Sequence, residues 1–555
     1  MDSPFTSKLG TNYCPTVDET IAIKTLLIEP LLQMKRLDTK IAELQQALSK
    51  LLEKREGLQT YVQAHEALLS PIRRMPADVV QEIFKACLPT HRNCVMDASE
   101  APLLLGRVCS AWRTLSLATP RLWASLHIVD PGEPPRPKES EPVWPVAPQE
   151  PRAALVEDVV WTWLERAGHC PLSISLQYDI ELGYMPSHSI IQTIFSLASR
   201  WQHIRFAATD PAFQELVQLS AADVPELQSV ELQYNQVGWG SSGFAWDTLS
   251  FLAGATIKVV VVNGAGSDLP QLPIEWTRLT LLSNLPFPDE DLIRTGDRSR
   301  LKIEAGLLAM SRCVQLRSLS FALADYFSDI SDLGELPFVD HHLLQTLHLS
   351  GYGNTLSAFL QRIGVPQLKD LTLREMRDSW GNARRDSFPE PSLIRFLANL
   401  TLLESLSLTT SCISLSSLTQ ILLHLPRTLQ HLHIDADKAR TSSYYVADSP
   451  VDFLASLVLP GLTIPLPLLR DFDIAVAGEE GMTDETLLQF ITTRATTLKR
   501  VKINFERAMD LDIREALSPL IENGLDFAVT YTPPKIQKYS PWTGLPDGPK
   551  PAVVL

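Results

Sequence analysis

Residues 227–237 read LQSVELQYNQV, with apolar side chains at the first, fourth and sixth positions. Alternate side chains of a strand point to the same face, so the fourth and sixth residues share one buried face. Clear copies of this pattern start at Leu227, Leu316, Leu344, Leu368, Leu403, Leu429, Leu469 and Leu498. Weaker copies start at Trp201, Thr256 and Trp276, with forerunners at Trp123 and Pro171. The pattern predicts a long series of short strands.

Segments with helical spacing of apolar residues precede many of these strands, for example 190–197 and 418–425. A helix and a short strand cannot bury their apolar sides alone, so such units stack into one curved parallel sheet. Residues 155–531 resemble the leucine-rich-repeat family, which implies an α/β solenoid. The copy at Leu227 also has Asn235, the residue that the family places after its strand, whereas most other copies lack it.

A heptad stripe of apolar residues lies within residues 28–66. Its members are Met34, Leu37, Ile41, Leu44, Leu48, Leu51, Leu58 and Val62, and Arg55 interrupts it. Such a stripe on a helix must be buried against another helix. Two interpretations remain open: a coiled coil that forms a homodimer, or a helix that packs on its own domain.

The chain changes composition at three places. Residues 131–151 contain eight prolines, which remove amide donors and fix φ. We therefore predict that residues 129–154 form a stiff, solvated linker between domains. Residues 1–27 and the tail 532–555 are predicted to be disordered.

Residues 67–128 contain two predicted apolar helices. The first begins near Met75-Pro76, since proline is tolerated in a first helical turn. Its apolar side chains are Val79, Val80, Ile83, Phe84 and Cys87, and those of the second helix are Leu104, Leu105, Val108, Cys109 and Trp112. A segment this short cannot bury so much apolar surface alone, so we expect a partner protein to cover it. The alternative is a helical hairpin that packs on the repeats.

This segment resembles an F-box, whose pattern is filled by Met75-Pro76, Ile83-Phe84, Val108-Cys109, Trp112 and Leu122-Trp123. With its heptads, proline linker and repeats, the chain is similar to the F-box proteins abundant in mushroom-forming (basidiomycete) fungi. The resemblance implies docking on the Skp-type adaptor and cullin of an SCF (Skp–cullin–F-box) ubiquitin ligase. The adaptor contacts that it implies are Met75, Pro76, Val79, Ile83, Phe84, Leu88 and Leu104. It further implies that Val108, Cys109, Trp112 and Trp123 hold the motif's own helices together.

The repeats would then bind an unknown protein substrate. In each strand, the side chains beside the inward pair face the concave surface of the solenoid. The substrate-binding candidates selected in this way are His348, Arg374, His431, His433, Asp471, Asp473, Arg500 and Lys502. The runner-up hypothesis is a scaffold that dimerises through its heptads and has no role in a ligase.

Composition and motifs exclude several other classes of function. The net charge of −15 opposes general binding to nucleic acid or membranes. The sequence lacks a phosphate-binding glycine loop, an H-E-x-x-H helix and a G-x-S-x-G turn, so we expect no enzyme, metal or cofactor. Seven scattered cysteines without C-x-x-C spacing, and no signal peptide, favour the cytoplasm, the nucleus or both.

Overall fold

The computed structural model describes most of the chain. The described residues are 3–69, 71–130, 152–178, 188–208, 210–234, 244–285, 300–324, 336–375, 390–409, 415–435, 453–458, 465–477, 482–505 and 507–531. The predicted tail and most of the predicted proline linker lie outside them. The chain divides into two compact units, Met1–Ile83 and Phe84–Leu555, and each is described by itself.

The first unit consists mainly of helix α1, Val17–Leu69. This corrects the prediction of a disordered segment 1–27 and a helix starting at residue 28. A reciprocal cap explains the earlier start: the N–H of Thr16 donates to the Glu19 carboxylate at 2.9 Å, and the N–H of Glu19 donates to the Thr16 hydroxyl at 3.4 Å. Hydrogen bonds from Lys8, Thr16 and Tyr13 lower the pKa of Glu19 to about 2.

The predicted F-box segment forms three α-helices in place of the expected two. They are α2 (Ala77–Ala86), α3 (Leu105–Val108) and α4 (Ser110–Leu117). The second predicted helix is broken at Cys109, whose backbone is extended at φ −159° and ψ 169°. Cys109 instead begins α4, because its sulfur accepts the N–H of Trp112 at 3.4 Å.

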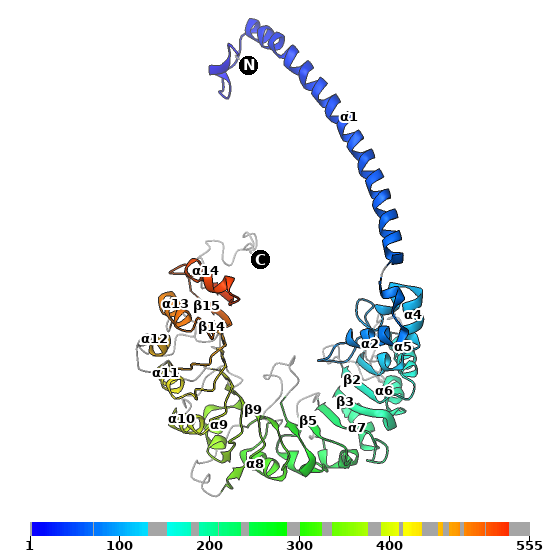
Figure 1. Cartoon of the computed structure of the whole chain (residues 1–555), viewed down its shortest axis with the longest axis vertical. Helices are drawn as coiled ribbons and strands as arrows, with labels where there is room; N and C mark the ends of the chain where they lie inside the picture. The colour runs from blue at the N-terminus through cyan, green and yellow to red at the C-terminus, as the bar shows by residue number, and fades with distance from the viewer. Residues whose placement is uncertain are drawn as a thin grey trace, which may run out of the picture. The chain divides into compact units, whose positions relative to one another are not determined.

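A parallel sheet of fourteen described strands forms the body of the second unit, and neighbouring strands follow one another along the chain (Figure 1). Its strands are β1 Ser125–Asp130, β2 Leu172–Tyr178, β3 Trp201–Ala208, β4 Ser229–Tyr234, β5 Val259–Asn263, β6 Leu281–Ser283, β7 Ser318–Ala322, β9 Thr346–Gly351, β11 Asp370–Glu375, β12 Ser405–Thr409, β13 His431–Asp435, β14 Asp471–Ala477, β15 Arg500–Phe505 and β16 Asp526–Tyr531. Strands β8 (Val339–Asp340) and β10 (Ile363–Gly364) pair separately.

Helices connect successive strands and cover the outer side of the curved sheet (Figure 1). They are α5 Arg152–Arg166, α6 His188–Phe195, α7 Asp210–Val217, α8 Ile303–Arg312, α9 Gly353–Leu360, α10 Glu390–Ala398, α11 Leu415–Leu423, α12 Phe453–Val458, α13 Asp484–Thr493 and α14 Arg514–Glu522. Short 3₁₀ turns connect β4, β5 and β6. The unit is a leucine-rich-repeat-like α/β solenoid, as predicted.

The core is built from the rows of inward side chains that the pattern predicts. In every clear copy, the fourth and sixth residues are buried, and register pairs them across neighbouring strands; Leu347, Leu371, Leu406 and Leu432 form one such row. Burying each leucine contributes roughly 1.5–3 kcal/mol. The strand register of the eight clear copies is confirmed.

Two weak copies have a register different from the prediction. On β5 the inward pair is Val260 and Val262, because a run of four valines has no polar residue to mark the outer face. On β6 the inward residues are Leu282 and then Asn284, which lies just past the strand and is fully buried. The side chain of Asn284 accepts the N–H of Ala322 at 2.7 Å and so replaces an apolar residue.

The start of the sheet also differs from the prediction, which placed it after residue 154. Strand β1 begins inside the predicted F-box, ends within the predicted linker, and pairs in parallel with β2 over six residues. Trp123, just before β1, is 2% exposed and packs edge-on against Trp163 of α5 at 4.9 Å. Helix α5 itself starts at Arg152, within the predicted linker. Residues 84–130 therefore belong to the same compact unit as the repeats.

A buried ionic cluster closes the other end of the sheet. The Asp484 carboxylate, 1% exposed, accepts hydrogen bonds from Arg507, from the hydroxyl of Tyr531 at 3.0 Å and from the N–H groups of Asp510 and Leu511. Arg507 also lies over the ring of Phe505 at 4.2 Å. These contacts join β15 and β16 to the start of α13.

Because Asp484 titrates, the stability that this cluster contributes depends on pH. Burial alone would raise the pKa of Asp484, but hydrogen bonds from Arg507, Leu511 and Asp510 outweigh it and lower the pKa. The stability that the carboxylate contributes is therefore present above the pKa of an unfolded aspartate. It is lost as the pH falls through the lower pKa of the folded state.

We predict that Asp484→Ala lowers the free energy of unfolding of the last repeats by about 3–5 kcal/mol, because it leaves the Arg507 charge buried without its carboxylate. Hydrogen exchange of the β15 and β16 amides measures the loss. The control is Asp510→Ala, which removes a 74% exposed carboxylate at 3.3 Å from the same guanidinium and should cost less than about 1 kcal/mol. Equal losses in both variants would contradict the assignment.

Candidate functional site

Helices α2 and α3 each leave apolar side chains open to solvent. On α2, Val79 and Ile83 lie one helical turn apart and are 40% and 36% exposed. Leu104 just before α3 and Val108 at its end are also one turn apart, 43% and 57% exposed. Each pair offers an apolar contact that no described part of the chain covers completely.

Two aromatic residues of this segment, Phe84 and Trp123, are buried. Phe84 is fully buried and meets the ring of Trp112 edge-on at 4.8 Å. The indole N–H of Trp123 donates to the carbonyl of Ser116 at 2.9 Å, and Arg166 lies over its ring. Phe84, predicted to contact a partner, is thus an interior residue in this structure. Trp123 takes the interior position expected of it, whereas Trp112 is half-buried.

The remaining predicted residues of this segment divide between surface and interior. Met75 and Leu88 are half-buried, and Pro76 is exposed. Val108 differs from the prediction of an interior position, because α3 ends at this residue and its side chain stays open. Cys109 is also exposed, and its sulfur caps α4.

A polar loop between α2 and α3 joins the helical segment to the first strands. The Asn93 side chain accepts hydrogen bonds from the hydroxyls of Ser125 and Ser173 at 2.9 and 2.7 Å, and donates to Ser175 at 3.0 Å. The next residues continue the connection, since Val95 forms a parallel bridge to His127. Sequence reasoning missed Asn93, because its partners lie more than thirty residues away and no local pattern marks it.

His127 lies beside this junction, on the concave face of the sheet, which is called the inner face below. Its ring nitrogen Nδ1 lies 2.9 Å from the hydroxyl of Ser175. Burial, with the nearby charges of Arg205 and Arg92, lowers the pKa of His127. A neutral imidazole fits a site made of hydroxyl and amide groups, so the junction carries no charge of its own.

The predicted substrate candidates gather on the inner face of the last strands. Register aligns His431 with Asp471, Asp471 with Arg500, and Arg500 with Asp526, as one row across four strands. A second row aligns His433, Asp473 and Lys502. The structure thus brings six of the eight candidates together, whereas His348 and Arg374 lie on β9 and β11.

Neighbouring charges in these rows pair with each other. His431 Nδ1 lies 2.7 Å from Asp471 Oδ2, His433 Nδ1 lies 3.4 Å from Asp473 Oδ2, and Arg500 Nε lies 3.3 Å from Asp526 Oδ2. His348 is similarly 3.8 Å from Asp370. Solvent-exposed pairs of this kind are each worth about 0–1 kcal/mol, so a ligand can displace them at low cost. The face offers paired charges of both signs.

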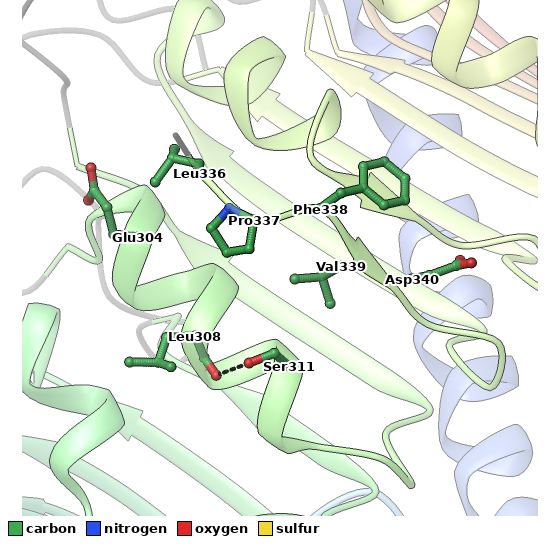
Figure 2. A pocket seen from close by; sticks show the side chains of 8 residues that line it. All are labelled: Glu304, Leu308, Ser311, Leu336, Pro337, Phe338, Val339 and Asp340. Carbon is green, nitrogen blue, oxygen red and sulfur yellow. Dashed lines mark hydrogen bonds between the residues drawn. The ribbon is translucent and has the colours of Figure 1, made fainter. Parts of the chain in front are cut away.

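An open groove of about 470 Å³ lies between α8 and the segment that leads into β8 (Figure 2). Its lining combines apolar residues, among them Leu308 and the 61% exposed Phe338, with the carboxylates of Glu304 and Asp340. This groove uses none of the sequence-predicted residues. The groove thus presents apolar side chains with a carboxylate from each side.

No group of three or more His, Cys, Asp or Glu side chains within the described residues is arranged to hold a metal ion. No helix among them is long and apolar enough to cross a membrane.

The similarity of the chain to known proteins is low. No protein-family model and no curated protein matches the chain. Among solved structures, the chain is similar to the leucine-rich repeat-containing protein LegL7 from Legionella pneumophila, at 15% identity and a TM-score of 0.31, over 60% of this chain and 92% of LegL7. It is also similar to TLR13 in a complex with ssRNA13, at 11% identity and a TM-score of 0.18, over 64% of this chain and 61% of that one.

We predict that Asn93→Ala loosens the junction between the helical segment and the sheet. Removing the amide leaves the hydroxyls of Ser125, Ser173 and Ser175 without a shared partner, at a cost of about 1–3 kcal/mol. Faster hydrogen exchange of the β1 amides, with unchanged exchange in β9 to β12, is the expected result. Asn523→Ala, an exposed residue after α14, is the matched control. If both variants exchange as the wild type does, Asn93 does not hold the junction.

Proposed function

We propose that this protein is a non-catalytic adaptor, in which the helices of residues 67–128 act as an F-box and the repeats bind a protein substrate. The F-box would dock on a Skp-type adaptor and bring the substrate to the cullin of an SCF ubiquitin ligase. The observation that carries the proposal is the exposure of the apolar side chains Val79, Ile83 and Leu104, although the neighbouring Phe84 is fully buried. Exposed apolar groups of this kind are stabilised when a partner covers them.

The junction at Asn93 supports the same role. An adaptor that positions a substrate gains from a fixed connection between its docking helices and its receptor, because fixed geometry lowers the entropic cost of the reaction. Four hydrogen bonds and a strand bridge tie the loop 93–95 to β1 and β2. The sheet then continues to β16 through adjacent pairs of strands.

The compartment is part of this proposal. All six cysteines that the structure describes are free thiols: Cys14, Cys87, Cys94, Cys109, Cys170 and Cys313. Burial raises the pKa of Cys94, and that of Cys313 to about 12, so both thiols stay protonated. Free thiols fit the reducing cytoplasm or nucleus, where ubiquitin ligases of this type act.

We predict that Ile83→Lys and Leu104→Lys each abolish co-purification with a Skp-type adaptor, because each places a charge on an apolar contact. The matched control is Leu423→Lys on α11, where the replaced leucine is 44% exposed on the outer side of the sheet. It should capture the adaptor as the wild type does. Phe84→Ala is a poor test, since loss of this buried ring would disturb the segment itself. A wild-type chain that never captures the adaptor would falsify the ligase role.

The second candidate function is a scaffold that forms a homodimer through α1. One observation favours it: all eight residues of the heptad stripe are 49–66% exposed. Arg55 would form the single polar layer, a feature that fixes register in coiled coils at some cost in stability.

We predict that the wild-type chain has the mass of a dimer and that Leu44→Lys with Leu48→Lys has the mass of a monomer, by size-exclusion light scattering. The control carries the same two charges off the stripe, as Gln46→Lys with Ser49→Lys, and should remain a dimer. A wild-type monomer at micromolar concentration would exclude this scaffold.

A further inference from the structure

A row of side chains runs along the rim of the sheet where the strands begin. It consists of the second residue of each repeat pattern, and the N–H of each member donates to the carbonyl of the previous one at 2.7–2.9 Å. We call this the rim row; its members are Gln202, Gln228, Lys258, Thr280, Arg317, Gln345, Lys369, Glu404, Gln430, Arg470 and Lys499. The hydrogen bonds fix the order and spacing of these side chains.

The rim row is basic although the protein is acidic. It contains five cations (Lys258, Arg317, Lys369, Arg470 and Lys499) and one carboxylate, a formal charge of 5 − 1 = +4, against −15 for the whole chain. All five cations are exposed. This concentration of one sign on one edge attracts anionic partners.

Four of these five cations have no carboxylate partner among the described residues. Lys369 pairs with Glu404 at 3.1 Å. In the described part of the chain, no carboxylate lies within ion-pair distance of Lys258, Arg317, Arg470 or Lys499. Arg470 and Lys499 are moreover direct neighbours, since the N–H of Lys499 donates to the carbonyl of Arg470 at 2.7 Å. Like charges opposite each other on adjacent strands are destabilising.

We propose that the rim row from Arg317 to Lys499 binds an extended acidic segment of a partner protein. The six strand steps between these residues span about 29 Å at about 4.8 Å per step. A fully extended peptide of about nine residues covers that length. Carboxylates along such a peptide relieve the repulsion between Arg470 and Lys499 and meet the unpaired Arg317.

The neighbouring inner face restricts where this segment lies. Asp471 and Asp473 stand one and three residues further along the strand than Arg470, and their carboxylates already pair with His431 and His433. An acidic peptide that moved from the rim onto the inner face would meet these aspartates and be repelled. A long nucleic acid is disfavoured for a related reason, because its further phosphates would meet the net negative surface of the chain.

This inference names the ligand class for the receptor role proposed above and rests on that role. The adaptor role and the peptide-binding inference can be tested independently, because adaptor capture depends on Ile83 and Leu104, whereas the rim row lies in the repeats. A chain that captures the adaptor and binds no acidic peptide would lose only the present inference.

The test is fluorescence anisotropy of the full chain with a labelled glutamate-rich peptide at low and physiological salt. Arg470→Gln with Lys499→Gln should weaken binding about tenfold, as expected when two exposed charge contacts are lost. The matched control removes two exposed cations of the outer helices, Arg395→Gln with Arg514→Gln, and should bind within about twofold of the wild type. Both double variants change the net charge equally. A difference between their affinities for the peptide therefore shows that binding depends on the rim row and not on the net charge.

Further probes identify the source of the negative charge. A phosphoserine peptide that binds more tightly than the glutamate peptide, and is weakened by the same rim variant, supports the site and assigns it to phosphorylated segments. The proposal is overturned if the wild type does not bind either peptide, or if both double variants weaken binding equally. Tighter binding of a single-stranded polynucleotide or of a lysine-rich peptide overturns it as well.

Discussion

The fold depends on one constraint: the backbone hydrogen bonds and the inward side chains of each strand are completed only by the neighbouring strands. Its backbone donors and acceptors pair with the strands on either side, and its two inward side chains are covered by the rows that continue across the sheet. Leu371 and Leu373 illustrate this, since register aligns them with leucines on both β9 and β12. An inner repeat therefore needs little local specificity beyond its apolar pattern. The first and last strands each lack one neighbouring strand, and at these two ends polar side chains stabilise the sheet.

The polar contacts at the two ends of the sheet differ in kind: one set is neutral and the other is ionic. At the first strand, Asn93 binds three serine hydroxyls with neutral groups, and the loop that carries it also connects the docking helices. At the last strands, Asp484 and Arg507 form a buried ion pair that α13 and β16 enclose. The first end thus joins the loop between α2 and α3 to the sheet. The second end closes the solenoid.

Sequence patterns predicted the elements whose signal is local. The 1-4-6 pattern located β7, β9 and β11 to β15, because each inward pair is marked by polar neighbours. It failed at Val259–Val262, where nothing breaks the valine run, and at Asn284, where an amide replaces an apolar residue. The pattern also missed β16, whose first pattern position is Gly524. Strand β1 was recognised as a pattern but assigned to the wrong domain, because its pairing with β2 spans a proline-rich stretch.

The candidate site was predictable to a similar extent. Strand alternation selected the inner-face residues, but only the observed register shows that His431, Asp471 and Arg500 stand in one row. The resemblance to an F-box predicted that Phe84 contacts a partner. The residue type alone does not show that the ring of Phe84 packs against Trp112 within the chain. The rim row escaped prediction altogether, since its members are separated by 20 or more residues and share no residue type.

An uninterrupted sheet has a consequence for the reach of the proposed ligase. From β1 to β16 there are thirteen strand steps, about 60 Å along the sheet at roughly 4.8 Å each. A substrate held near Lys499 would sit at a different, fixed separation from the first strand than one held near β3. The repeat at which a protein binds would thereby determine which of its lysines can receive ubiquitin.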